Sequence, residues 1–254
     1  FSLANVKSNA EVEEADTKTM LSSPKDDYTK SLWAVRSYKR EQKPLPVAGT
    51  VPVVSVRNIS AAYGDVQVLE DVSFDIHAGR TVAVVGESGS GKSTAARCIT
   101  GLLPPSNGQV FFNGEELPGY YRARSKDQLR QAQMIYQMAD TALNPKLRIS
   151  EIVGRPALFY GGLRGAKLKA RVDELLDLIE LEPAQYYNRY PPELSGGQKQ
   201  RIGIARALAA EPSFIICDEV TSALDQLVAE GILRLLDRLQ SEFNLAYMFI
   251  THDL

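Results

Sequence analysis

Two short segments of the chain carry residue types that suit phosphate chemistry, and about a hundred residues separate them. The first, residues 86–93, reads Gly-Glu-Ser-Gly-Ser-Gly-Lys-Ser and fits the pattern G-x-x-x-x-G-K-S/T. Glycines in such a loop let backbone N–H groups turn inward around phosphate oxygens, at the positive end of a helix dipole. The spacing therefore predicts a nucleotide site in which Lys92 contacts the β- and γ-phosphates and the Ser93 hydroxyl binds Mg²⁺.

The segments on either side of this loop are those that a phosphate-binding loop requires. Thr81–Val85 before it is a β-branched apolar run, which is typical of a buried strand. Residues 93–100 after it suit a helix. A plain glycine turn before a helix is the alternative interpretation, but a chance match to the full pattern is expected in roughly one of 100 chains of this length.

The second segment is Leu194-Ser-Gly-Gly-Gln198, which is typical of a helix start. Ser195 stands at the position of an N-cap, and residues 198–210 continue as a plausible helix. A helix N-terminus flanked by glycines is again an anion site. The segment alone does not indicate whose phosphate it would hold, and a glycine-rich loop ahead of a helix is the alternative.

The chain resembles the ATP-binding subunits of ABC transporters over roughly residues 51–254. Elements typical of that family occur here in its order. They are Tyr63, the phosphate loop at residues 86–93, Gln137, the signature at residues 194–198, Asp218 with Glu219 at the end of an apolar run, the D-loop that ends at Asp225, and His252. The resemblance implies an α/β fold: a P-loop NTPase (RecA-like) core with a largely parallel sheet, an N-terminal antiparallel β portion and an inserted α-helical subdomain.

The resemblance also implies which residues hold the cofactors ATP and Mg²⁺. Tyr63 would stack on adenine, and a plain turn aromatic is the alternative. The loop residues that would hold ATP are Gly86, Glu87, Ser88, Gly89, Ser90, Gly91, Lys92, Ser93 and Thr94. Ser93, Gln137 and Asp218 would hold Mg²⁺, and the metal bridges β- and γ-phosphate oxygens.

Three residues are implied to act at the γ-phosphate, namely Glu219, His252 and Gln137. Glu219 would orient the attacking water. Because an unperturbed Glu has a pKa of about 4.3, positioning the water comes before accepting its proton. His252 would stabilise charge on the γ-phosphoryl group, and Gln137 would sense Mg²⁺ and the water. The signature residues Ser195, Gly196, Gly197 and Gln198 would cap the ATP of a partner module, and Asp225 belongs to the D-loop.

Several partners follow from the same resemblance. A second ABC ATPase module would form a head-to-tail dimer with this chain. Two membrane permease subunits and, indirectly, a solute-binding protein would complete an importer at the cytoplasmic face of the inner membrane. Residues 143–145, Leu-Asn-Pro, are similar to a segment of oligopeptide, dipeptide and nickel importers. Met138, Ala139 and Val220 depart from that pattern, which affects the choice of solute more than the ATPase activity.

The composition agrees with this interpretation. Lys and Arg number 29 against 31 Asp and Glu, so a net charge of −2 gives no electrostatic case for nucleic acid. Cys98 and Cys217 have no spaced partners for a metal, and a reduced cytosol is the simple interpretation. No apolar run approaches the ~18–20 residues of a membrane span, and no signal-peptide pattern is found. We therefore expect any transport pore to belong to other chains.

The organisation of the chain is uneven. Residues 1–50 are polar, charged and poorly periodic, so we expect a linker there. Within it, residues 27–32 are similar to the tail of an oligopeptide-type ATPase, which implies that this chain is the second module of a fused pair. The ATP-binding domain would occupy residues 51–254, with its core at 51–137 and 210–254 and the helical subdomain at 138–209. Apolar runs predict strands near residues 53–56 and 72–76, and residues 109–114 predict a strand that enters an Asn-Gly turn. The apolar spacing over residues 167–181 predicts a helix. The family continues beyond His252, so we expect a missing C-terminal end.

Other classes of protein share part of these motifs. An ABC ATPase of the translation-factor type, which acts on ribosomes, is the main alternative to an importer. A DNA-repair type inserts a long coiled coil between the glutamine and the signature, and the segment from Gln137 to Ser195 is too short for it. Exporters usually have a membrane domain just upstream, and residues 1–50 show none. A P-loop kinase or GTPase lacks the signature.

Overall fold

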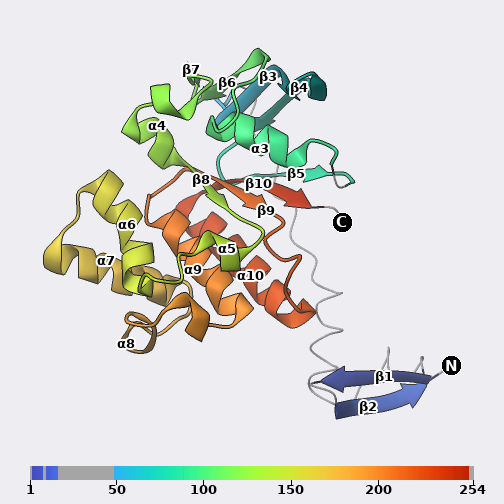
Figure 1. Cartoon of the computed structure of the whole chain (residues 1–254), viewed down its shortest axis with the longest axis vertical. Coiled ribbons are helices and arrows are strands. Elements are labelled where there is room, and N and C mark those ends of the chain that lie inside the picture. Colours follow the sequence, from blue (N-terminus) through green and yellow to red (C-terminus); the bar gives the residue numbers. More distant parts are fainter. Residues whose placement is uncertain (1, 8–9, 17–48, 88, 252–254) are drawn as a thin grey trace.

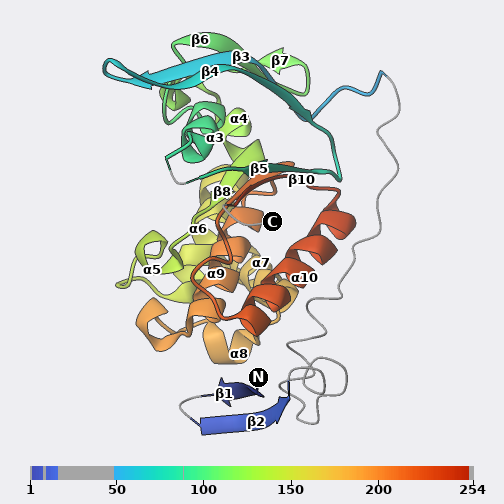
Figure 2. The same cartoon turned by 90° about the vertical axis from the view of Figure 1, so that its right-hand side faces the viewer.

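The computed structural model describes residues 2–7, 10–16, 49–87 and 89–251, and residues 49–251 form layers (Figure 1). An antiparallel sheet lies at the top, a parallel sheet in the middle and a group of helices below (Figure 2). Helix α3 (Lys92–Thr100) lies between the two sheets. This is the α/β architecture that the motifs predict.

The parallel sheet has the strand order β5-β10-β9-β8. Its strands are β5 (Thr81–Val85), β8 (Ala132–Ile135), β9 (Phe214–Asp218) and β10 (Ala246–Thr251). Alternate side chains of β9 point to opposite faces, so Ile215 and Cys217 pack with the helices below, whereas Phe214 and Ile216 pack with α3 and the upper sheet. Because all four strands run in the same direction, the segments that leave their carboxyl ends meet at one edge of the sheet.

The antiparallel sheet has the order β4-β3-β6-β7. Its strands are β3 (Val54–Tyr63), β4 (Val66–Ile76), β6 (Asn107–Phe112) and β7 (Glu115–Glu116). β3 and β4 are longer than the apolar runs at residues 53–56 and 72–76 predict, because irregularities in the β3–β4 register interrupt the alternation of side chains. The predicted Asn-Gly turn is confirmed, since Asn113 and Gly114 both have positive φ, 48° and 85°.

Helices fill the connections between strands and cover the lower face of the parallel sheet (Figure 1). Those between β7 and β9 are α4 (Lys126–Gln131), α5 (Ala139–Ala142), α6 (Ile149–Gly161), α7 (Gly165–Leu178), α8 (Pro183–Tyr186) and α9 (Gly196–Leu208), with the 3₁₀ turns η1 (Tyr121–Ala123) and η2 (Pro191–Glu193). α10 (Gln226–Phe243) joins β9 to β10. The helix predicted over residues 167–181 ends at Leu178, because Glu180 adopts a φ of 61° that a helix does not allow.

Two further observations concern the expected linker and the membrane. Ser2–Lys7 (β1) and Ala10–Asp16 (β2) pair as antiparallel strands, which the expectation of a linker over residues 1–50 did not foresee. Backbone pairing needs no periodic apolar face, so composition alone misses it. Residues 17–48, including the segment 27–32, lie outside the described residues. Within the described ranges, none of the helices is long and apolar enough for a membrane span.

Candidate active site

The loop between β5 and α3 curls around the ammonium group of Lys92. Lys92 Nζ donates to the carbonyl oxygens of Gly86 and Glu87, at 2.7 Å each, and its side chain is buried. Gly91 is the N-cap of α3 with a φ of 91°, and its carbonyl accepts the first helical hydrogen bond, from Ala95 N–H at 2.9 Å. The loop thus holds a cation beside a helix N-terminus, which is the anion site that its spacing predicts. Ser88 lies outside the described residues.

A cavity of about 430 Å³ opens next to this loop. It is lined by Tyr63, Val68, Gly89, Gly91, Lys92, Ser93, Thr94, Gln137 and Glu219. These residues come from the antiparallel sheet, from the phosphate loop and α3, and from the segments that follow β8 and β9. The volume lies in the range of small-molecule sites. A larger groove of about 660 Å³ lies elsewhere, between β8 and α6, but it contains none of the phosphate-loop residues. The smaller cavity is therefore the candidate nucleotide site.

Asp218 ends β9 and faces the first residues of α3. Ser93 Oγ lies 3.5 Å from each carboxylate oxygen of Asp218, although 125 residues separate the two in sequence. Burial raises the pKa of the Asp218 carboxyl, and the neighbouring charge of Glu219 raises it further, while Ser93, Arg97 and Lys92 act in the opposite direction. A hydroxyl and a carboxylate side by side offer the hard oxygen ligands that Mg²⁺ prefers.

This donor set fits Mg²⁺ bound together with a nucleotide. Within the described residues, no group of three His, Cys, Asp or Glu side chains could hold a metal alone. Mg²⁺ does not need one, because it keeps several waters and takes phosphate oxygens beside one or two carboxylates. The arrangement therefore fits a metal site that a bound nucleotide would complete.

Glu219 directly follows Asp218 and is held in a defined position. Its backbone has a φ of 45°, which is uncommon for a residue other than glycine, and its N–H donates to Ile250 O at 3.0 Å. Gln137 Nε2 donates to Glu219 Oε2 at 2.6 Å, across 82 residues of sequence. The structure therefore brings together two of the three residues predicted to act at the γ-phosphate. The third, His252, lies outside the described residues.

Tyr63, the last residue of β3, also lines the cavity. The residue is 43% exposed, and its hydroxyl accepts a hydrogen bond from Arg97 Nη1 at 2.9 Å. Sequence reasoning named Tyr63 but missed Arg97 and Val68. Arg97 could have been found, because it follows Ser93 by four residues on the same helix face. Val68 carries no sequence signal, since only the approach of β4 to the loop brings it to the cavity.

The signature forms the N-terminus of α9, away from this cavity. Ser195 Oγ accepts from Gln198 N–H at 3.3 Å, and Gln198 Oε1 accepts from Ser195 N–H at 2.9 Å, which confirms the predicted N-cap. Ser195 and Gly196 are exposed, and the signature residues are not among those that line the nucleotide cavity. At Gly197 an added Cβ would lie 2.4 Å from Val228 Cγ1 of α10, so packing alone requires glycine there.

Asp225, the predicted D-loop residue, has a local structural role. Its side chain accepts a hydrogen bond from Val228 N–H at 3.1 Å and caps α10. The D-loop thus connects the segment after Glu219 to a well-capped helix. The same helix contains Val228, which contacts the signature glycine.

Comparison with known proteins defines the class. The family model described as ABC transporter matches residues 69–222, which is more than half of the chain. With a phosphate loop, a strand ending in Asp218-Glu219 and a glycine signature on this fold, the chain belongs to the ABC transporter family. Two solved structures of this family share the fold. One is cbiO1 of Clostridium perfringens, described as part of the ABC transporter complex cbiONQ, with a TM-score of 0.70, 28% identity and coverage of 80% of this chain and 79% of the other.

The second solved structure is a dimeric, post-hydrolysis ATP-binding cassette bound to ADP and Pi. It has a TM-score of 0.68 and 33% identity, and the match covers 79% of this chain and 88% of the other. Among curated proteins, the oligopeptide transport ATP-binding protein OppF of Haemophilus influenzae is 46% identical over 73% of this chain and 56% of its own length. AppF of Bacillus subtilis is 41% identical over 75% of this chain and 58% of its own length. The nickel import ATP-binding protein NikE of Escherichia coli is 44% identical over 74% of this chain and 69% of its own length. The chain therefore spans a little over half the length of OppF and AppF.

Proposed function

We propose that this chain binds and hydrolyses ATP to power an importer of peptides or related small solutes such as nickel complexes. The observation that carries the proposal is the contact between Gln137 and Glu219 in the same cavity as the phosphate loop. A carboxylate that can orient a water thus lines the same cavity as the side chains of Lys92 and Ser93, which supports the proposal. This is the set of groups that phosphoryl transfer to water requires.

Each residue has a task that follows from its position. The loop N–H groups and Lys92 hold the phosphates, and Ser93 and Asp218 hold Mg²⁺, which neutralises charge on the β- and γ-phosphates when bound. Glu219 orients the attacking water, because its backbone is fixed and its carboxylate is anchored by Gln137. Tyr63, which lines the same cavity, stacks on the adenine. His252 is assigned to the γ-phosphoryl group from the resemblance alone.

The signature acts on a second nucleotide, bound to a partner module. Its exposed N-terminus on α9 is separate from the cavity of its own chain, so a head-to-tail dimer is needed to complete each site. The dimeric post-hydrolysis cassette with which this fold aligns supports such an arrangement. The partner is a second ABC ATPase module, fused upstream or separate.

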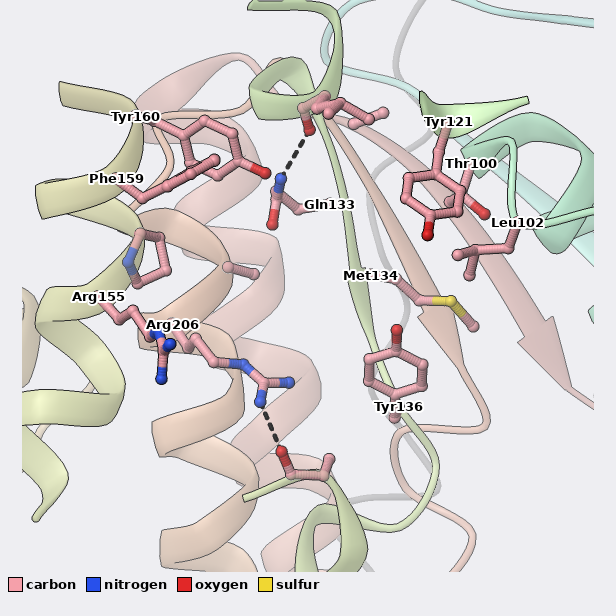
Figure 3. Close-up of a pocket in the computed structure, with 15 residues that line it drawn as sticks. Thr100, Leu102, Tyr121, Gln133, Met134, Tyr136, Arg155, Phe159, Tyr160 and Arg206 are labelled. Carbon is pink, nitrogen blue, oxygen red and sulfur yellow. Dashed lines mark hydrogen bonds between the residues drawn. The ribbon is translucent and has the colours of Figure 1, made fainter. Parts of the chain in front are cut away.

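The groove between β8 and α6 supports assembly with permease subunits (Figure 3). One wall carries Tyr121 and Leu102, and the opposite wall carries Phe159, Tyr160 and Arg155. Phe159 is exposed and the two tyrosines are half-buried, and aromatic side chains beside an arginine are typical of protein interfaces. We assign this groove to a loop of a membrane permease, so the chain would sit at the cytoplasmic face of the inner membrane. OppF, AppF and NikE are the relatives that suggest the solute class.

Glu219→Gln tests the ATPase assignment. The amide keeps the size and the hydrogen bond of the side chain but loses the negative charge, so ATP affinity should persist while turnover falls by about 10²–10⁴. The variant should also accumulate as a nucleotide-bound dimer. Phosphate release and binding of a fluorescent ATP analogue measure the two quantities, and Glu115→Gln in the exposed strand β7 is the control. Turnover close to that of the wild type would show that Glu219 is not catalytic.

Co-purification tests the transport assignment separately. Expressed in its host, the protein should purify with two hydrophobic permease subunits. Substitution of the groove residue Phe159 by Glu should release them and leave ATP binding unchanged, because Phe159 lies outside the nucleotide cavity. Sedimentation with ribosomes instead would overturn the importer and support the translation-factor alternative.

A further inference from the structure

The hydroxyl of Ser222 forms hydrogen bonds with both Gln137 and Glu219, the two residues assigned to the attacking water. Ser222 Oγ donates to the backbone carbonyl of Glu219 at 3.0 Å and accepts from Gln137 Nε2 at 3.3 Å. The Ser222 N–H donates to the same carbonyl at 3.1 Å. We propose that Ser222 is a positioning residue for ATP hydrolysis within its own chain: it fixes the orientation of the Gln137 amide and the turn that carries Glu219.

The first part of the argument concerns the amide of Gln137. A primary amide has two N–H donors on one nitrogen and one carbonyl oxygen. Gln137 Nε2 donates to Glu219 Oε2 at 2.6 Å and to Ser222 Oγ at 3.3 Å, so both donors have acceptors. The Oε1 atom is then the end of the amide left to contact a water or Mg²⁺. Without the Ser222 hydroxyl one N–H loses its acceptor, and only the bond to Glu219 Oε2 still orients the amide.

The second part concerns the backbone of Glu219. A φ of 45° is unfavourable for a residue with a Cβ, so surrounding contacts must hold it. On one side Glu219 N–H donates to Ile250 O, and on the other the Glu219 carbonyl accepts both bonds from Ser222. Two bonds from Ser222 therefore hold the turn that directs the carboxylate into the cavity, and the hydroxyl supplies one of them.

These contacts predict an effect on the chemical step more than on binding. Ser222 is not among the residues that line the nucleotide cavity, so its loss should leave the apparent KM for ATP close to the wild-type value. Because it acts through Gln137 and Glu219, kcat should fall by about fivefold to tenfold, as expected for one lost hydrogen bond. The inference rests on the proposed ATPase function.

The test compares Ser222→Ala with two matched variants. Ser222→Thr keeps the hydroxyl and should restore activity. Ser106→Ala removes a serine hydroxyl that also donates to a carbonyl, that of Ser60 at 3.0 Å, but in the antiparallel sheet, and should not change kcat. In a Gln137→Ala background, Ser222→Ala should lower kcat by clearly less than in the wild type, because the bond to the Gln137 amide is already gone and only the bond to the Glu219 carbonyl remains to be lost. A full additional loss in that background would overturn the inference.

A second readout does not depend on activity. The side-chain amide signals of Gln137 can be identified in an NMR spectrum as those missing in Gln137→Ala. Without nucleotide they should shift in Ser222→Ala and stay unchanged in Ser106→Ala. Unchanged signals would overturn the positioning role. If the wild-type protein does not hydrolyse ATP, the proposed function fails, whereas the amide signals still decide the role of Ser222. Ser222→Cys, of similar size and weaker as a donor, serves the same comparison if the alanine variant loses its fold.

Discussion

Gly91 stands where the phosphate loop approaches β4, and an alanine there should destabilise the protein by about 2–4 kcal/mol. Its φ of 91° is costly for a residue with a Cβ, at about 1–2 kcal/mol. An added Cβ would also lie 2.8 Å from Leu69 Cδ2 and 2.9 Å from Val68 O. Leu69 is buried and Val68 O is backbone, so relieving these contacts should add about 1–2 kcal/mol.

Gly89→Ala is the matched control within the same loop. Gly89 has a similar φ of 84°, but an added Cβ would meet nothing within 4 Å. This variant should therefore lose only the backbone term, about 1–2 kcal/mol. The difference in unfolding free energy between the two variants measures the cost of the close approach of the loop to β4. The conformational preference of glycine cancels, because both variants lose it.

Thermal and urea unfolding without nucleotide measure this difference. For a domain of about 200 residues, 2 kcal/mol corresponds to about 4–8 °C in Tm. Gly91→Ala should therefore melt several degrees below Gly89→Ala. Equal melting temperatures would refute the reasoning, because they would mean that β4 does not press against the loop at Gly91.

Three other predictions follow from single contacts. Asp225→Ala should lose the N-cap bond to Val228 N–H and about 1 kcal/mol of unfolding free energy, whereas Asp225→Asn should keep most of both, as urea unfolding would show. Burial raises the pKa of Cys98 to about 11 and also raises that of Cys217, so at pH 8 the thiolate of Cys98 is about 200-fold rarer than that of an exposed cysteine. Alkylation of the folded protein should be slow and should become fast in urea; rapid labelling without urea would contradict the burial. Tyr63→Ala should weaken ATP binding about tenfold, with Tyr63→Phe near wild type, and equal affinity of all three proteins would exclude base stacking.

Local features of the fold follow from the sequence because each depends on neighbouring residues. The run Thr81–Val85 becomes β5 with the predicted bounds, and Asn113-Gly114 forms the predicted turn. The prediction that this strand is buried is wrong, because β5 lies at the edge of the parallel sheet and its side chains are exposed or half-buried. The helix over residues 167–181 is found as α7, but three residues shorter at its C-terminal end. Apolar periodicity continues through Ile179 and Leu181, which are buried after the helix has ended, so the pattern cannot show where the backbone turns.

The same distinction applies to the site. The spacing of residues 86–93, the acid at the end of β9 and the N-cap Ser195 are local patterns, and the sequence alone determined a phosphate loop, an acid at the end of a strand and a second helix N-terminus. Only the tertiary structure decided that Gln137 meets Glu219, that Ser222 joins them and that Val68 reaches the cavity. These contacts join segments up to 85 residues apart. They depend on the parallel register of β8, β9 and β10 and on the packing of one sheet against the loop of the other, which no local pattern encodes.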